Sequence, residues 1–174
     1  EPYRRQRQMC IRDSLGGIYS KEQEMKVCEL TKELNIVAPH TKIEASNDVI
    51  NALYGALGGK DGIVLIAGTG SVCYGKNNGK TFRVGGYCYK EGDLGSAYDL
   101  GYKALQYLAK VIDKREEETS FSKRLKETIN CYTYEDLTRY YMSATRTDVA
   151  SLARVVTLEQ NEEHAKSIIK SAVS

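Results

Sequence analysis

Apolar residues follow one another without alternation over Gly62–Ala67, in the sequence GIVLIA. A continuous β-branched run of this length is typical of a strand that is buried on both faces. The chain then turns at 68–71, and a second strand-like run continues as far as Lys76. Asn77-Asn78-Gly79 predicts a hairpin turn, because Asn-Gly tolerates the positive φ angles that such turns need. We therefore predict a central strand followed by a hairpin whose returning strand is 80–84.

Apolar residues at helical spacing lie on both sides of this hairpin. The capping-box pattern Ser20–Gln23 precedes one helix, and a short strand over 42–45 leads into a second helix that begins at Asn47-Asp48. Beyond the hairpin, a second capping box at Ser96–Asp99 opens a series of apolar stripes. These stripes predict a helical C-terminal half.

Length and composition exclude several classes of protein. With 174 residues, 41% hydrophobic and 28% charged, the chain fits one globular domain. No apolar run approaches the ~20 residues of a membrane span, and no signal peptide is recognisable. The five cysteines include no C-x-x-C pair, so we expect neither a disulfide framework nor a thiolate metal site. A reducing, cytoplasmic location without a membrane partner is the expectation.

Residues 1–14 differ in character from all that follows. Four arginines against two acidic residues contribute +2, which is the whole formal charge of the chain. A basic arm for nucleic acid is one interpretation. The string over 4–14 also resembles translated sequencing-adapter DNA, and we favour this second interpretation. We therefore treat 1–14 as a non-native basic tail that does not pack onto the domain, and we expect no nucleic-acid partner.

Two short segments carry candidate chemistry. Gly68-Thr69-Gly70-Ser71 permits positive φ angles and lets backbone N–H groups converge on an anion, although an ordinary tight hairpin also explains these four residues. Asp48 lies in the first turn of a predicted helix. It is either a helix cap that contributes roughly 0.5–1 kcal/mol or a general base that accepts a proton from a substrate hydroxyl.

Four motifs occur in order: Asn47-Asp48, Ile66–Ser71, Gly85-Gly86-Tyr87 and GDLGS at 92–96. Together they resemble the second phosphate motif and its surroundings in the actin-like ATPase and sugar kinase superfamily. The likeness is greatest to N-acetylglucosamine kinases and the BadF/BadG/BcrA/BcrD ATPase family, and it covers about residues 15–174. This resemblance implies an α/β chain with an actin-like ATPase (ribonuclease H-like) fold. The chain would be a partial copy of that fold, with a central β-hairpin sheet and a helical C-terminal half.

The resemblance also implies roles for individual residues. Asp48 would be the catalytic base, and Asn47 would orient it and bind substrate. The ATP phosphates would be bound by Gly68, Thr69, Gly70 and Ser71. The sugar would be bound by Asn47, Gly70, Ser71, Gly86, Tyr87 and Asp93. Family members carry Gly-Gly-Trp-Gly and Gly-Asp-Glu-Gly-Ser, where this chain has Tyr87, Cys88 and Leu94; the aromatic ring is kept, whereas the lost glutamate leaves the identity of the sugar open.

The resemblance divides the chain into parts of two kinase domains. Residues 15–60 would end the first domain and 61–174 would form the hairpin, sugar loop and helical part of the second, which we expect to be truncated. The family's first phosphate loop, with its magnesium anchor, is not recognisable before Leu15. We therefore expect no metal ligands within this chain, and we expect the chain alone not to turn over ATP.

Three functions are consistent with these motifs. The prediction is an ATP-dependent sugar kinase that phosphorylates an amino-sugar hydroxyl with ATP and Mg²⁺. Whether the protein forms a homodimer is left open. One alternative is a BadF/BadG-type ATPase that activates a 2-hydroxyacyl-CoA dehydratase. Such activators carry an iron–sulfur cluster on paired cysteines, which the scattered cysteines here do not match. The other alternative is a sugar-binding module without catalysis, which the change to Leu94 would favour.

Overall fold

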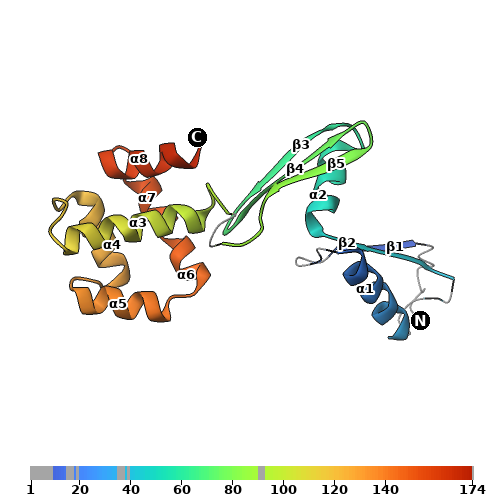
Figure 1. The fold of residues 1–174 in the computed structure, drawn as a ribbon, viewed down its shortest axis with the longest axis horizontal. Helices are drawn as coiled ribbons and strands as arrows, with labels where there is room; N and C mark the ends of the chain where they lie inside the picture. The colour runs from blue at the N-terminus through green and yellow to red at the C-terminus, as the bar shows by residue number, and fades with distance from the viewer. Residues whose placement is uncertain are drawn as a thin grey trace, which may run out of the picture. The chain divides into compact units, whose positions relative to one another are not determined.

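The computed structural model describes residues 10–14, 18, 20–34, 38, 40–89 and 93–173. They belong to two compact units. The first unit comprises 1–64 and 74–82, and the second comprises 65–73 and 83–174. Figure 1 shows the elements of both.

Two parallel strands and two helices make up most of the first unit: β1 (Cys10–Ser14), α1 (Lys21–Glu33), β2 (Lys42–Ser46) and α2 (Asp48–Leu57). The capping box at Ser20 is confirmed. Its hydroxyl accepts the Gln23 N–H at 3.3 Å, and the Gln23 side chain accepts the Ser20 N–H at 3.2 Å. Helix α1 contacts β2, and Ala45, Val49 and the fully buried Leu53 belong to the core of this unit.

The prediction that residues 1–14 stay apart from the domain is wrong for Cys10–Ser14. These residues form β1, which pairs with β2 in parallel from Cys10 opposite Lys42 to Ser14 opposite Ser46. The physical reason is that strand pairing uses backbone N–H and C=O groups, which every residue but proline carries whatever the charge of its side chain. The first nine residues lie outside the described part of the chain.

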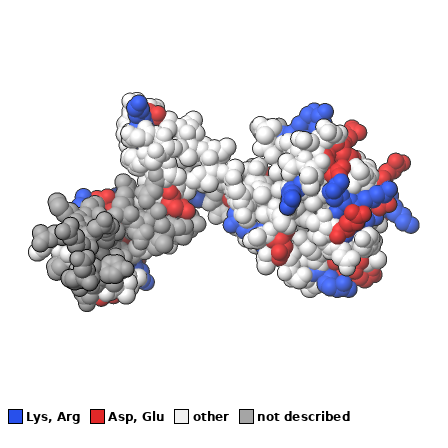
Figure 2. All heavy atoms as spheres, turned by 180° about the vertical axis from the view of Figure 1, so that it is seen from behind, with Lys and Arg blue, Asp and Glu red and all other residues white. Residues whose placement is uncertain are grey.

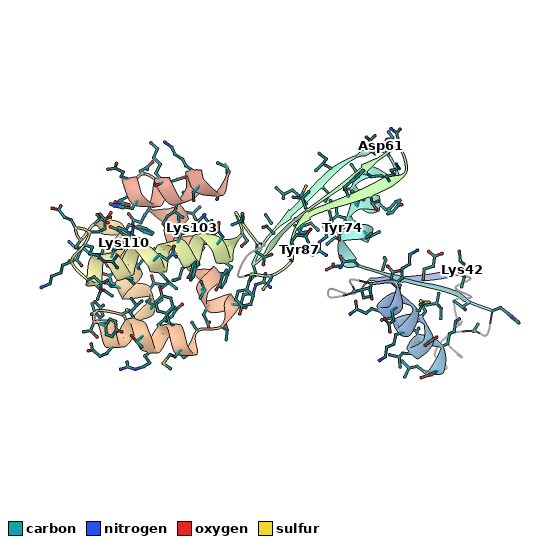
Figure 3. The ribbon with its side chains drawn as sticks, in the orientation of Figure 1. Lys42, Asp61, Tyr74, Tyr87, Lys103 and Lys110 are labelled. Carbon is teal, nitrogen blue, oxygen red and sulfur yellow. The ribbon has the colours of Figure 1, made fainter. Side chains whose placement is uncertain are left out.

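A three-stranded sheet follows, in the order β3 (Gly62–Ala67), β4 (Ser71–Asn77) and β5 (Lys80–Gly85). The predicted hairpin is confirmed, because Asn78 and Gly79 both have positive φ, at 49° and 76°. Asp61 fixes this turn by accepting the Asn78 N–H at 2.9 Å. Figure 3 shows Asp61, which precedes β3, and Tyr74 on β4.

The predicted central strand is instead at an edge. In the part of the chain that the structure describes, β3 pairs with β4 alone, and the side chains of Ile63 and Leu65 are 73% and 69% exposed. A continuous apolar run is buried only where another element covers it, and the sequence of the strand does not say which element does so. The prediction of burial on both faces is therefore wrong for these residues.

Six helices of the second unit follow the sheet: α3 (Ala97–Ile112), α4 (Ser120–Ile129), α5 (Tyr134–Ser143), α6 (Arg146–Ser151), α7 (Ala153–Leu158) and α8 (Glu163–Ala172). The predicted helical half is confirmed. Helix α3 contacts each of the other five, which lie around it in Figure 1. Their fully buried side chains include Leu105, Leu108, Phe121, Leu125, Leu152 and Val156. Lys, Arg, Asp and Glu side chains are interspersed over the surface of this unit, as Figure 2 shows.

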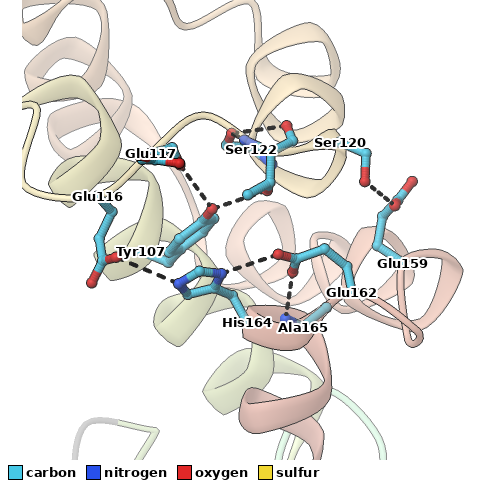
Figure 4. A network of polar contacts seen from close by, with 10 residues as sticks. Tyr107, Glu116, Glu117, Ser120, Ser122, Glu159, Glu162, His164 and Ala165 are labelled. Carbon is cyan, nitrogen blue, oxygen red and sulfur yellow. Dashed lines mark hydrogen bonds and ion pairs between the residues drawn. The ribbon is translucent and has the colours of Figure 1, made fainter.

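Polar side chains hold the connection between α3 and α4 against α8. The hydroxyl groups of Tyr107 and Thr119 lie 3.0 Å apart, and the Tyr107 ring stacks on the His164 ring with 4.3 Å between centroids. His164 also contacts Glu116 at 3.5 Å and Glu162 at 3.0 Å (Figure 4). Burial raises the pKa of the Tyr107 phenol, so this group remains neutral near pH 7 and acts as a packing and hydrogen-bonding residue.

Helices α3 and α6 approach each other at Gly101. A Cβ atom built on Gly101 would overlap the backbone carbonyl of Val149, so only glycine fits at this crossing. This close contact sets how near α6 lies to α3, whereas the capping box of Thr145 and Asp148 sets where α6 begins. No helix among the described residues combines the length and the apolar character that crossing a membrane requires.

Candidate phosphate and sugar site

The turn at 68–71 joins β3 to β4 and is tied to the start of α3. The Gly68 N–H donates to the Gly70 carbonyl at 2.8 Å, which closes the turn on itself. The carbonyls of Gly68 and Thr69 accept N–H groups from Ala97 at 2.9 Å and from Tyr98 at 3.2 Å. The first turn of α3 therefore fixes two consecutive peptide groups of this segment.

Because of these hydrogen bonds, two N–H groups of the turn point to the side opposite α3. In a trans peptide the N–H points away from the C=O, so the N–H groups of Thr69 and Gly70 point away from α3. Among the described residues neither of these N–H groups has an acceptor. Successive backbone N–H groups with a common direction form a concave site for an anion. This geometry supports a phosphate site at the turn, beyond what an ordinary hairpin requires.

Ser71 connects the turn to the segment before α3. Its hydroxyl donates to the Leu94 carbonyl at 2.6 Å. The Gly95 N–H donates to the Asp99 carboxylate at 2.9 Å, and the fully buried Ser96 caps α3 by accepting the Asp99 N–H at 3.2 Å. The predicted cap at Ser96 is confirmed, but the reciprocal bond of a capping box is absent here, because Asp99 accepts the N–H of Gly95 and the Ser96 N–H donates to the Asp93 carbonyl. Its consequence is that the motif at 93–96 is held directly beside the phosphate turn.

Asp93 faces the turn and an arginine. Its side chain is 6% exposed and forms an ion pair with Arg146, the first residue of α6. A Cβ atom built on Gly70 would lie 2.6 Å from the Asp93 carboxylate and would overlap the Arg146 guanidinium. A larger residue at position 70 would therefore force the Asp93 and Arg146 side chains to shift. Arg146 is a residue of this site that sequence reasoning missed, since a lone arginine at a helix start gives no distinguishing signal.

The predicted sugar loop follows β5. Gly85 and Gly86 have φ angles of 73° and 68°, which favour glycine, and a Cβ on Gly86 would lie 2.7 Å from that of Val72. The Tyr87 ring is 75% exposed and lies under the Arg83 guanidinium at 5.2 Å (Figure 3). This leaves an aromatic ring accessible to a sugar. Gly92 lies outside the described residues.

Three tyrosines connect this loop to α3. The rings of Tyr89 and Tyr98 meet edge to face at 5.0 Å, and those of Tyr98 and Tyr102 stack at 6.1 Å. Arg146 lies over the Tyr89 ring at 5.6 Å. Burial, followed by the two neighbouring phenols, raises the pKa of Tyr98. Tyr98 therefore stays protonated near neutral pH and serves as packing rather than as a base.

Asn47 and Asp48 lie in the first unit, whereas the phosphate turn and sugar loop lie in the second. Asn47 caps α2 by accepting the Val49 N–H at 3.0 Å, and its side-chain amide donates to the Ile18 carbonyl at 2.9 Å. Asp48 is exposed and also accepts the Val49 N–H, at 2.9 Å. Its carboxylate therefore satisfies the geometry of a cap while remaining accessible to a substrate.

The metal-ligating side chains of the described residues are dispersed. No three side chains of His, Cys, Asp or Glu there lie close enough to hold an ion together. Asp93, the acidic residue beside the phosphate turn, is paired with Arg146. Magnesium bound with ATP takes its ligands largely from water and the phosphates, so it needs no such cluster of side chains.

The elements described above make up part of an actin-like ATPase fold. Two solved structures share this fold with the chain. A protein of Chromobacterium violaceum provisionally assigned as an N-acetylglucosamine kinase has a TM-score of 0.76 at 22% identity, over 92% of this chain and 55% of its own. One of Porphyromonas gingivalis with the same provisional assignment has a TM-score of 0.66 at 17% identity, over 94% and 55%. The predicted fold is confirmed.

The chain belongs to the BadF/BadG/BcrA/BcrD ATPase family, whose model matches residues 14–174. Over 118 residues it is 42% identical to the N-acetylmuramic acid/N-acetylglucosamine kinase of Clostridium acetobutylicum, covering 66% of this chain and 39% of that protein. Over 125 residues it is 39% identical to the N-acetyl-D-glucosamine kinase of Dictyostelium discoideum, covering 71% and 39%. The chain therefore spans about two fifths of the length of these curated relatives. The predicted family is confirmed.

Proposed function

We propose that the protein carrying this chain is an ATP-dependent kinase that phosphorylates a hydroxyl group of an N-acetylated amino sugar. The observation that carries the proposal is the pair of N–H groups of Thr69 and Gly70, which point away from α3 and have no acceptor among the described residues. Family membership and the names of the two curated relatives support the same activity. The cytoplasm, where ATP is available, is the proposed location, and a homodimer stays a prediction.

The surroundings of the turn, of Tyr87 and of Asp48 support a role for each of them in the proposed reaction. The turn Gly68–Ser71 would bind phosphate oxygens of ATP through backbone N–H groups, which need no charged side chain. The exposed ring of Tyr87 would stack on a face of the sugar, with Gly86 keeping the backbone close to it. Asp48 would accept the proton of the attacking hydroxyl, and Asn47 would hold the start of α2 that carries it.

Phosphoryl transfer depends mainly on positioning and on stabilising the charge of the phosphates. When bound with ATP, Mg²⁺ would neutralise part of that charge. The contribution of this chain is then to orient the phosphates at the turn and the sugar at its loop. Asp48 can act as the base only when the attacking hydroxyl lies within hydrogen-bond reach of its carboxylate.

Sugar-dependent release of ADP tests the proposal. The full-length protein that carries this chain is assayed with ATP, Mg²⁺ and either N-acetylglucosamine or N-acetylmuramic acid, with glucose as the matched sugar that lacks the acetamido group. We expect ADP release with at least one of the acetamido sugars and much less with glucose. Sugar binding without ADP release would favour a binding module. Visible absorbance of the anaerobically purified protein, typical of an iron–sulfur cluster, would favour an electron-transfer activator.

A further inference from the structure

An arginine from the helical half reaches the phosphate turn. Arg146 pairs with Asp93, from which it is 53 residues distant in sequence, and both groups pack against the Cα of Gly70. The Asp93 side chain is almost completely buried, at 6% exposure, whereas that of Arg146 is 42% exposed. The ion pair therefore lies beside Gly70, and the side chain of Arg146 is partly accessible to solvent.

The position of Arg146 is set by contacts of α6 with α3 and with the sugar loop. Gly101 lets α6 approach α3 so closely that no side chain fits between them. Thr145 caps α6, and the Thr145 N–H and the Asp148 carboxylate are 2.8 Å apart. The ring of Tyr89 lies beneath the guanidinium at 5.6 Å, which adds a cation–π contact. These contacts restrict where Arg146 can be.

A buried carboxylate requires compensation, because an unpaired charge in a low-dielectric environment is strongly unfavourable. Among the described residues Arg146 provides the ion pair of Asp93. Without Arg146, the Asp93 carboxylate would turn toward solvent, and the space beside Gly70 would open. The backbone at Gly70 would then lose the two side chains that lie against it.

We infer that Arg146 is a positioning residue for nucleotide binding: through Asp93 it holds Gly70 in place, so that the N–H groups of Thr69 and Gly70 keep their common direction. This inference rests on the proposed function. It assigns Asp93 to support of the turn, in addition to any contact with the sugar. Arg146 acts through Asp93 and Gly70 and is not a catalytic residue.

Equilibrium binding of a non-hydrolysable ATP analogue tests this role without any need for turnover. The variants are Arg146→Met, which keeps the aliphatic stem, and Arg146→Lys, which keeps the charge. Arg139→Met is the matched control, since Arg139 pairs with an acidic residue on the exposed face of α5. We expect Arg146→Met to weaken analogue binding roughly tenfold or more, the effect of misdirecting one charge-assisted hydrogen bond. Arg146→Lys should recover part of the loss, and Arg139→Met should bind as the wild type does.

Sugar affinity and melting temperature complete the test. In Arg146→Met the affinity for N-acetylglucosamine should fall less than that for the analogue, because Asp93, the predicted sugar-binding residue, is retained. If Arg146→Met does not fold, Arg146→Gln replaces it, and the same weakening of analogue binding is expected. Wild-type analogue affinity in a folded Arg146→Met variant, or an equal loss of sugar and analogue affinity, would overturn the inference. Absence of ADP release from the wild type would instead count against the proposed function.

Discussion

Replacement of Gly70 by alanine is the most direct perturbation of the phosphate turn. The added methyl group would lie 2.6 Å from the Asp93 carboxylate and would overlap the Arg146 guanidinium. Overpacking of this kind costs typically about 1–3 kcal/mol of stability. Because the end of the Arg146 side chain is partly exposed, it can move aside, so we expect a cost in the lower half of that range. For a chain of this length, that corresponds to a fall in melting temperature of roughly 2–8 °C.

The functional effect of Gly70→Ala should exceed its effect on stability. Hydrogen bonds from an N–H to a charged group contribute about 1.5–3 kcal/mol each. Misdirecting one N–H of the turn should therefore raise the KM for ATP roughly 10- to 100-fold. The KM for the amino sugar should change little.

Gly75→Ala is the matched control, because a Cβ at Gly75 on β4 would meet its nearest neighbours at 3.9 Å, an ordinary contact. Melting curves and steady-state kinetics of the two variants are compared with those of the wild type. If Gly70→Ala melts and binds ATP as Gly75→Ala does, the ion pair does not confine the turn and the argument from packing fails.

Three further predictions concern other parts of the molecule. Asp48→Asn keeps the cap but removes basicity, so turnover should fall by roughly 10²–10⁴ with little change in sugar affinity; unchanged turnover would leave Asp48 as a helix cap. Tyr87→Ala should raise the KM for the sugar and leave that for ATP unchanged, whereas Tyr87→Trp should retain affinity; equal effects on both substrates would contradict stacking. The N–H groups of Tyr132 and Thr133 and the Thr133 hydroxyl lower the pKa of Asp136. Its contribution to stability is therefore complete above its ordinary pKa of about 3.9 and is lost as the pH falls toward the lowered value. Melting temperatures between about pH 5 and pH 2 should fall less steeply in Asp136→Asn than in the wild type.

Local sequence was sufficient for those features that depend on neighbours in the chain. The Asn78-Gly79 turn, the caps at Ser20 and Ser96 and the helical half were predicted correctly, because turn dihedrals, capping hydrogen bonds and helical periodicity are all set within a few residues. The ordered motifs also identified the family, since several short segments with a fixed order are far more specific than one. The roles assigned to Asp48 and Tyr87 stay predictions.

Tertiary structure decided what depends on partners distant in sequence. Whether the apolar strand β3 is covered depends on which elements pack against it, and in the described residues it lies at a sheet edge. The pairing of Cys10–Ser14 with β2 uses backbone groups that no composition reveals. The contact of Arg146 with Asp93 and Gly70 likewise follows from how closely α6 crosses α3 at Gly101, a property of two packed helices and not of either sequence segment alone.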